Sequence, residues 1–390
     1  MQKQARLQTE QRPELRKREV RTAKDPARRG SGMYFYMPTK VYSERDCVKK
    51  YAHQWTALGQ KALIVTGKSS EQNGARKDVT DALRENGTDF VIFDETEQNP
   101  SVELVMKVRE IGLRENADFV IGIGGGSPMD AAKAAALMIA QADKDAEFLY
   151  EKGADDALPV VEVPTTCGTG SEVTPYAILT VHERHIKSSL PHKIYPVYAL
   201  LDGKYLTGAK KEILVNTAVD ALGHFIESYV NTNATPFSHM LCEYGMGVWN
   251  SNKKLLIGAG ITPEECDSLL LASALAGMAI AHTGTALPHG LSYYLTYEKG
   301  IPHGKAVGYF LPGYLSEARP LMRKRVLALA GFPDMQYFTA FIHNLIGTME
   351  PDEELITKAV RGLMSNEDKL RNVPYPVTED MLYHICSMAQ

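Results

Sequence analysis

Four residues in the second half of the chain have the types and spacings of metal ligands. Asp220 and His224 are four residues apart in a stretch with helical periodicity, so both side chains point the same way, about one turn apart. His289 and His303 follow, each between a proline and a glycine. Three imidazoles and one carboxylate form a donor set that suits Fe(II), Zn, Co, Ni or Mn. On spacing alone His282, seven residues before His289, competes for a place in this set.

A glycine-rich turn in the first half suits an anion. The segment 122–130 (GIGGGSPMD) follows an apolar run and precedes an alanine-rich helical stretch at 131–140. Glycines let an anion approach the backbone, and free N–H groups at a helix start attract negative charge. Ser127 suits the N-cap and Pro128 the first helical position. Although Ser127 replaces the third glycine of the strict G-x-G-x-x-G motif, we predict a phosphate or pyrophosphate site.

A second polar turn, at 164–174 (PTTCGTGSEVT), also follows an apolar run. Its hydroxyls and glycines suit contact with a polar ligand. Ligands of open α/β sheets bind outside the carboxyl ends of the strands. We therefore expect both turns to lie at the same sheet edge.

The elements that must position these residues divide the chain in two. Short apolar runs, which we predict to be strands, alternate with helical patterns at 62–66, 90–93, 119–123 and 160–163. This alternation predicts βαβ units and a mainly parallel sheet covered on both faces. After residue 206 long helical patterns dominate. We predict an α/β domain at 33–205 and an all-helical domain at 206–390.

The first 32 residues differ in charge from the rest. They contain ten Lys or Arg and four acidic residues, a charge of +6. Because the net charge of the whole chain is −4, the other 358 residues carry −10. Without aromatic residues they cannot bury enough apolar surface to fold, and we predict a disordered basic arm at 1–32. Because the folded pattern starts at Met33, translation beginning there is a hypothesis that terminal sequencing of the native protein would test.

Composition excludes several classes of protein. A chain of 390 residues with 44% hydrophobic and 23% charged residues is typical of a soluble globular protein of two or three domains. No run approaches about 18 consecutive apolar residues, so we predict no membrane span. The five cysteines stand singly, which argues against a disulfide scaffold and indicates a cytoplasmic location. The acidic body argues against nucleic acid as a partner.

Taken together and in order, these motifs resemble the iron-dependent (group III) alcohol dehydrogenase family. The resemblance covers about 358 of 390 residues and rests on the glycine turn with Lys133, the turn at 164–174, the Asp220–His224 pair, and His289 with His303. It implies an N-terminal dinucleotide-binding α/β domain, a C-terminal all-helical metal-binding domain, and a site in the cleft between them. It also implies an alcohol dehydrogenase or aldehyde reductase, commonly a homodimer, that transfers a hydride between a primary alcohol and NAD(P).

The resemblance assigns roles to individual residues. It makes Asp220, His224, His289 and His303 the ligands of Fe(II), with Zn as the alternative, and it gives His282 no counterpart. It implies no catalytic residue beyond these ligands. It implies that the cofactor pyrophosphate is bound by Gly125, Gly126 and Ser127. It lines the rest of the dinucleotide site with Asn99, Thr165, Thr166, Thr169, Thr174, Ile178 and Lys187.

Two departures from the family pattern bear on function. Many NAD-using members carry an acidic residue after the first strand, whereas this chain has Gly67, followed by Lys68 and Ser69. Glycine leaves room for a 2′-phosphate, and a cation or hydroxyl can bind it, so we predict NADP over NAD with Gly67 and Ser69 in the site. Tyr293 stands where many members have a further histidine, so the resemblance does not extend to a histidine proton relay.

Other functions remain as alternatives. Zinc polyol dehydrogenases of the glycerol type and dehydroquinate-synthase-like lyases share the implied architecture but bind zinc with fewer histidines. A nucleotide-binding protein without catalysis would have no reason to keep the full ligand set. The substrate is expected to be a small alcohol or aldehyde, with Phe225, Tyr293 and Tyr294 as either pocket wall or core.

Overall fold

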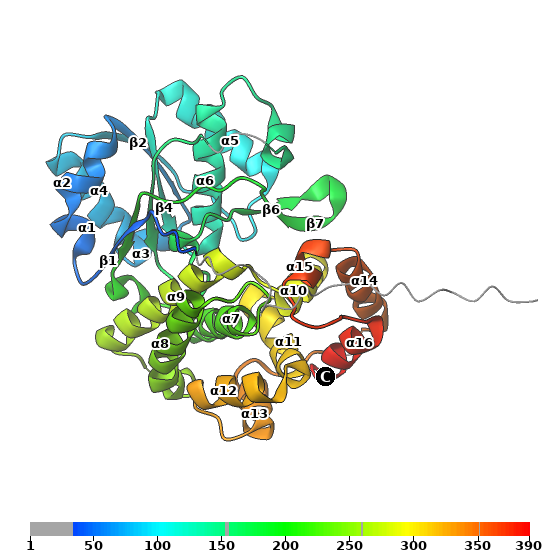
Figure 1. Ribbon diagram of the computed structural model, residues 1–390. Helices are drawn as coiled ribbons and strands as arrows, with labels where there is room; N and C mark the ends of the chain where they lie inside the picture. The colour runs from blue at the N-terminus through cyan, green and yellow to red at the C-terminus, as the bar shows by residue number, and fades with distance from the viewer. Residues whose placement is uncertain (1–33, 153–155, 259, 351) are drawn as a thin grey trace, which may run out of the picture.

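The computed structural model describes residues 34–152, 156–258, 260–350 and 352–390. An α/β half and a helical half lie against each other (Figure 1). The basic arm predicted at 1–32 and the start proposed at Met33 lie outside the described residues.

A six-stranded parallel sheet forms the centre of the α/β half. Its order is β1-β8-β5-β4-β2-β3, and all neighbouring strands are parallel. The four predicted runs correspond to β2 (Lys61–Thr66), β3 (Asp89–Phe93), β4 (Phe119–Gly124) and β5 (Val160–Pro164). Two strands that the sequence analysis did not predict complete the sheet, β1 (Lys40–Ser43) and β8 (Tyr198–Leu201).

Helices cover both faces of this sheet, so successive strand residues enter different cores. In β2, Ile64 packs with Leu83 of α4 (Ala75–Glu85), whereas Leu63 packs with Val108 of α5 (Val102–Glu115). The alanine-rich α6 (Gly126–Ala140) shares the second face with α5 (Figure 1). Short helices complete this half: α1 (Cys47–Lys50), α2 (Ala52–Trp55) and α3 (Ser69–Gln72).

An antiparallel hairpin projects from the α/β half toward the helical half (Figure 1). It consists of β6 (Ile178–Val181) and β7 (Ile186–Ser189), and β7 contacts α10 (Leu287–Lys299). The hairpin therefore connects the two halves by contact.

After β8 the described chain contains no strand. The predicted boundary at 205 falls in the 3₁₀ helix η6 (Gly203–Leu206). α7 (Lys211–Tyr229) is buried over most of its length and packs against α8 (Pro236–Asn252), α9 (Pro263–Thr283) and α11 (His303–Glu317). Thr235 and Thr262 begin α8 and α9 with capping boxes followed by proline. The remaining helices are α12 (Pro320–Leu329), α13 (Met335–Ile346), α14 (Glu353–Met364), α15 (Glu367–Arg371) and α16 (Glu379–Ser387).

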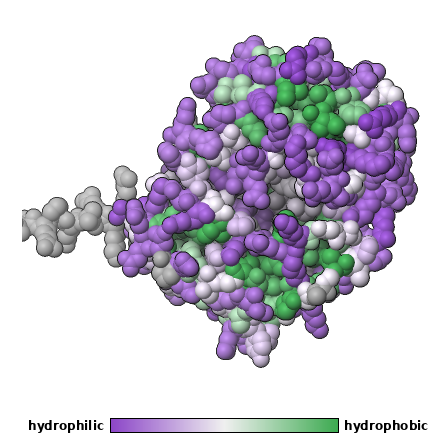
Figure 2. All heavy atoms as spheres, turned by 180° about the vertical axis from the view of Figure 1, so that it is seen from behind, coloured by the Kyte–Doolittle hydropathy of each residue, from purple (hydrophilic) through white to green (hydrophobic). Residues whose placement is uncertain are grey.

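Helix α9 is long and apolar enough to cross a membrane by length and composition, and no other described helix is. However, 61% of its apolar window is buried, and it packs between α7 and α8. A mostly buried core helix passes the same test of length and composition. On the face seen in Figure 2 hydrophilic residues cover most of the surface, and hydrophobic residues gather in separate patches.

Candidate active site

Three helices bring the four predicted metal ligands together. α7 carries Asp220 and His224, α10 carries His289 near its start, and His303 is the first residue of α11. One potential ligand atom from each of Asp220, His224 and His289 lies within 4.8 Å of the others. His303 completes the group, because its Nε2 atom is 3.8 Å from Asp220 Oδ1.

Each histidine ring is held through its Nδ1 atom. His224 Nδ1 is 3.2 Å from the carbonyl oxygen of Gly168, which can only accept, so Nδ1 carries the proton. His303 Nδ1 is 3.5 Å from the Ser292 hydroxyl, whose own proton is donated to the His289 carbonyl oxygen. In both rings the lone pair of Nε2 is left for a metal ion.

Glu227 orients His289, a role that the sequence analysis did not predict. It is fully buried one turn after His224 on α7, and its carboxylate accepts the proton of His289 Nδ1. It also accepts from the backbone N–H groups of Ala286 and His289, at 3.2 and 3.1 Å. Carboxylates commonly orient metal-binding histidines in this way. Its helical spacing from Asp220 and His224 was the available signal.

The polar atoms that face one another at this site fit a metal ion. Asp220 Oδ1 and His289 Nε2 are buried, 3.4 Å apart, and have no hydrogen-bond partner. Buried polar atoms without partners are rare, and a cation between them would satisfy both. A carboxylate and three imidazoles are suitable donors for Fe(II) or Zn.

Burial and neighbouring charges prepare these groups for a cation. Burial lowers the pKa of His224 to about 4 and holds the pKa of His303 well below its usual value. Burial acts in the same sense on His289, but Glu227 and Asp220 together raise its pKa to about 9. Burial opposes ionisation of Asp220, yet the three imidazoles keep its pKa below the usual value. The negative field that attracts a proton to His289 also attracts a metal cation.

The glycine turn lies directly against the second polar turn. A Cβ atom on Gly126 would lie 2.9 Å from Thr169 Cγ2, and one on Gly125 would lie 3.2 Å from the Thr166 side chain. The Thr165 amide donates to the Gly124 carbonyl oxygen at 2.8 Å. Both turns follow parallel strands, so they meet at the carboxyl edge of the sheet, as predicted from the sequence.

Ser127 does not cap α6, contrary to the sequence analysis. The helix begins at Gly126 with Gly125 as its N-cap, and no side chain caps it. The Ser127 hydroxyl instead accepts a hydrogen bond from the amide of Asn99, at 3.1 Å. Asn99 has φ of 58° and accepts from Lys187 Nζ at 2.8 Å, which ties the β3–α5 loop to the hairpin.

A single cavity of about 590 Å³ contains the metal cluster and much of the predicted cofactor site. All four ligands line it, and its size is typical of a small-molecule site. The predicted cofactor residues that line it are Asn99, Gly126, Ser127, Thr169, Thr174, Ile178 and Lys187. The others do not line it: Gly67, Ser69, Gly125, Thr165 and Thr166.

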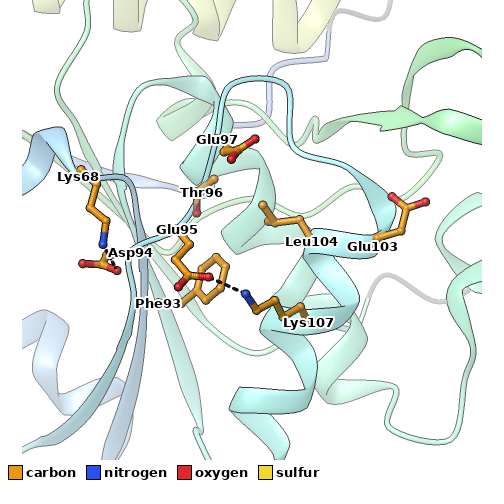
Figure 3. Close-up of a pocket in the computed structure, with 9 residues that line it drawn as sticks. All are labelled: Lys68, Phe93, Asp94, Glu95, Thr96, Glu97, Glu103, Leu104 and Lys107. Atoms are coloured by element: carbon orange, nitrogen blue, oxygen red, sulfur yellow. Dashed lines mark hydrogen bonds and ion pairs between the residues drawn. The ribbon is translucent and has the colours of Figure 1, made fainter.

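The residues predicted to select NADP lie outside this cavity, near a shallower pocket at the ends of β2 and β3. Figure 3 shows Lys68 on one wall of that pocket, facing Asp94, with Lys107 and Glu95 paired on the other side. Lys68 Nζ is 2.7 Å from Asp94, which also binds Arg76 at 3.0 Å. Two cations therefore share one carboxylate next to Gly67.

Of the remaining residues named in the sequence analysis, Tyr293 lines the cavity, and Phe225, Tyr294 and His282 do not. Tyr293 lines the cavity, and its ring stacks 5.8 Å from that of His303. Phe225 and Tyr294 do not line it, and Phe225 is fully buried in the helical core. His282 is outside the ligand cluster: it contacts the Met278 carbonyl oxygen and the Tyr36 amide and stacks on Phe35.

Two family models match the chain. The model of iron-containing alcohol dehydrogenase matches residues 38–203, and the C-terminal model of the Fe-containing alcohol dehydrogenase family matches residues 214–366. Together they cover most of both halves.

Individual relatives agree with these models. The crystal structure of an iron-containing alcohol dehydrogenase from Thermotoga maritima is 40% identical, has a TM-score of 0.85, and covers 91% of this chain and 99% of its own. The long-chain primary alcohol dehydrogenase of Thermoanaerobacter ethanolicus is 33% identical over 266 residues; the match spans 66% of this chain and 66% of that relative, just under two thirds of its length. The NAD-dependent methanol dehydrogenase of Bacillus methanolicus is 30% identical over 273 residues, 69% of this chain and 72% of the relative.

These matches confirm the predicted family and the fold class, a parallel α/β half followed by a helical half. The chain is therefore a member of the iron-containing alcohol dehydrogenase family.

Proposed function

We propose that the protein transfers a hydride between a primary alcohol, or the corresponding aldehyde, and NADP. We propose Fe(II) as the metal, with Asp220, His224, His289 and His303 as its ligands. The observation that carries this proposal is the single cavity that contains these four side chains next to the glycine turn. It supports binding of a metal and a dinucleotide within reach of one small substrate.

The chemistry divides between the bound groups and the chain. The metal supplies Lewis-acid polarisation of the alcohol or carbonyl oxygen, and the nicotinamide carries the hydride. Glu227 and Gly168 keep the protons of His289 and His224 on Nδ1, so that each Nε2 atom stays directed at the ligand cluster. Burial of Asp220, His224 and His289 limits the access of water to the cluster, which strengthens electrostatic interactions there.

The proposed preference for NADP rests on the end of β2. Gly67 brings no carboxylate to repel a 2′-phosphate, and the next residue, Lys68, shares the Asp94 carboxylate with Arg76. A phosphate there would compete with Asp94 for these two cations. We expect Gly67→Asp to shift the ratio of kcat/KM values from NADP toward NAD, because like charges repel.

That experiment compares both nucleotides in the wild type and the variant. Ser70→Ala, a change at a buried neighbour, is the matched control for local disturbance. An unchanged nucleotide ratio in Gly67→Asp would show that the phosphate is bound elsewhere.

The test of the whole proposal is nucleotide reduction on addition of primary alcohols to Fe(II)-loaded protein, against a chelated sample. We expect turnover that is lost with the chelator and restored by Fe(II). Turnover of glycerol but not of simple primary alcohols would favour the polyol dehydrogenase alternative. Nucleotide binding with no turnover of any alcohol or aldehyde would favour the non-catalytic alternative.

We also propose a homodimer in the cytoplasm. All five cysteines are buried and unpaired, which suits a reducing compartment. Exposed Phe237, Met240 and Tyr244 lie on one side of α8 and offer apolar surface to a second copy. Sedimentation at micromolar concentration tests the assembly.

A further inference from the structure

The cavity wall includes Lys369, a lysine that belongs neither to the ligand cluster nor to the nucleotide turns. Lys369 lies on α15 and lines the cavity together with Thr285 and Asn372. Its stem packs against α10 directly after a metal ligand, because a Cβ atom on Gly290 would lie 3.5 Å from Lys369 Cγ. The amine is therefore close to the metal cluster without belonging to it.

The hydrogen bonding of Lys369 differs from that of a structural buried lysine. Lys133 donates to Ser171 Oγ at 2.6 Å and to three carbonyl oxygens, and it pairs with Asp130 at 3.4 Å. Among the described residues, Lys369 Nζ has one hydrogen-bond partner, the Thr285 hydroxyl, and no carboxylate there lies within ion-pair distance of it. An ammonium group has three donors, so two of them remain for a ligand.

Hydrogen bonds to neighbouring residues hold Thr285, the partner of Lys369, in place. The Asn372 amide donates to the Thr285 carbonyl oxygen at 2.8 Å and accepts from Asn233 at 3.0 Å. These bonds fix Thr285, and through it they fix the position of Lys369 Nζ. Burial lowers the pKa of Lys369 to about 8, so the amine is still mainly charged at neutral pH.

Tyr293 sets the distance between this amine and the metal cluster. Its ring lies against His303, with 5.8 Å between the ring centroids, and Lys369 Nζ is 5.5 Å from the Tyr293 centroid. A ligand that extends from the cluster along the tyrosine ring would reach the amine after a short chain. Lys187 also lies 5.9 Å from this ring, but Asn99 holds it on the nucleotide side.

We infer that Lys369 binds an anionic group at the far end of the substrate, so that the preferred substrates are short aldehydes with a terminal carboxylate and the corresponding hydroxy acids. This inference rests on the proposed function, because it places the reacting carbon at the metal cluster. A bound carboxylate would use the remaining donors of Lys369 and compensate the charge of this partly buried ammonium group. The Tyr293 ring would line the apolar part of the chain.

The competing role for Lys369 is to balance the charge of Glu227 behind His289. In that role the lysine would act through the metal ligand, and its loss would affect charged and uncharged substrates alike. The charge of the substrate therefore separates the two roles.

The experiment compares reduction of 4-oxobutanoate and butanal by the Fe(II)-loaded enzyme with NADPH. We expect the wild type to prefer 4-oxobutanoate. Lys369→Met should lower kcat/KM for 4-oxobutanoate by about 10- to 100-fold, as expected for a lost hydrogen bond between charged groups, and leave butanal nearly unchanged. Lys369→Arg should restore part of the preference, whereas Lys324→Met, at an exposed lysine of α12, should change neither substrate.

A binding measurement separates failure of this inference from failure of the proposed function. Propane-1-sulfonate, an anion that coordinates metals poorly, should bind the wild type in calorimetry and bind Lys369→Met at least several-fold more weakly. If this holds while neither aldehyde is reduced, the anion site stands and the proposed function fails. The inference would be overturned if the wild type preferred butanal, or if Lys369→Met lowered kcat/KM equally for both aldehydes. It would also be overturned if propane-1-sulfonate bound the wild type and Lys369→Met with equal affinity.

Discussion

The two sides of the cavity are built on opposite principles. On the nucleotide side Gly125 and Gly126 expose their backbone because they have no side chain. Threonine side chains pack so close that a Cβ atom on either glycine would crowd them. On the metal side four side chains from three helices converge, and buried partners hold their orientation. Larger side chains should therefore weaken nucleotide binding on the first side. Smaller side chains should weaken metal binding on the second side.

The largest effect that follows from this contrast is expected for His289→Ala. It removes one proposed ligand and leaves Glu227 without its partner, so metal content and turnover should fall by more than the roughly 10- to 100-fold typical of outer-shell changes. Metal analysis and kcat measure this loss, and circular dichroism checks that the variant is folded. His282→Ala, at a histidine of the same half outside the cluster, should keep its metal. A fully active His289→Ala with normal metal content would refute the ligand assignment.

Next in size is Glu227→Gln, which keeps the shape of the partner but removes its charge. Affinity for the metal should fall by about 10- to 100-fold, because His289 is oriented less well and is a weaker donor. Titration against a competing chelator measures the change. Glu243→Gln, at a partly exposed carboxylate of α8, is the matched control. Equal affinities in both variants would mean that Glu227 does not support the metal site.

On the nucleotide side, Gly126→Ala should act by filling space. The new methyl group would lie 2.9 Å from Thr169 Cγ2, and overpacking of this kind costs about 1–3 kcal/mol. We expect KM for the nucleotide to rise by about tenfold, with metal content unchanged. The double variant Gly126→Ala/Thr169→Ser removes the opposing methyl group and should recover much of the loss. If it recovers nothing, crowding is not the cause.

The smallest effect concerns pH and Lys187. Burial lowers the pKa of Lys187 to about 8, although Asp130 and Asp220 favour its charge. The lysine therefore carries its charge below pH 8 and loses it as the pH rises through that value. Because the nucleotide is anionic, its KM should rise over this range in the wild type. In Lys187→Arg the rise should vanish, since arginine stays protonated; a persistent rise would assign the titration to another group.

The contrast between the two sides also explains what could be predicted from the sequence. The buried strands β2, β4 and β5 can be recognised in the sequence as apolar runs that end in turn residues. β8 (YALL) and the hairpin strands β6 and β7 have four residues each, too few for a period of two to be distinguished from a helical pattern. Tertiary pairing decides their structure.

Within the site, the spacing of Asp220 and His224 predicts a shared face, and the structure brings His289 and His303 to it. Ser127 has the residue type of an N-cap, but the approach of Asn99 gives its hydroxyl a different partner. Lys369 carries no signal in the sequence, because α15 is brought to the cavity by packing against α10 and α14. Partners that meet across distant elements cannot be recognised from spacing.

The position of the proposed ligands on α7, α10 and α11 has a consequence for unfolding. An ion held by all of them is a reversible cross-link between segments that are up to 83 residues apart, from Asp220 to His303. Since the unfolded chain cannot keep this geometry, the folded state gains RT ln(1 + [M]/Kd) from free metal M, about 1.4 kcal/mol for each tenfold rise in concentration above Kd. The melting temperature of the helical half should therefore rise with the concentration of free metal. A shortage of metal would lower the free energy of unfolding as well as the activity.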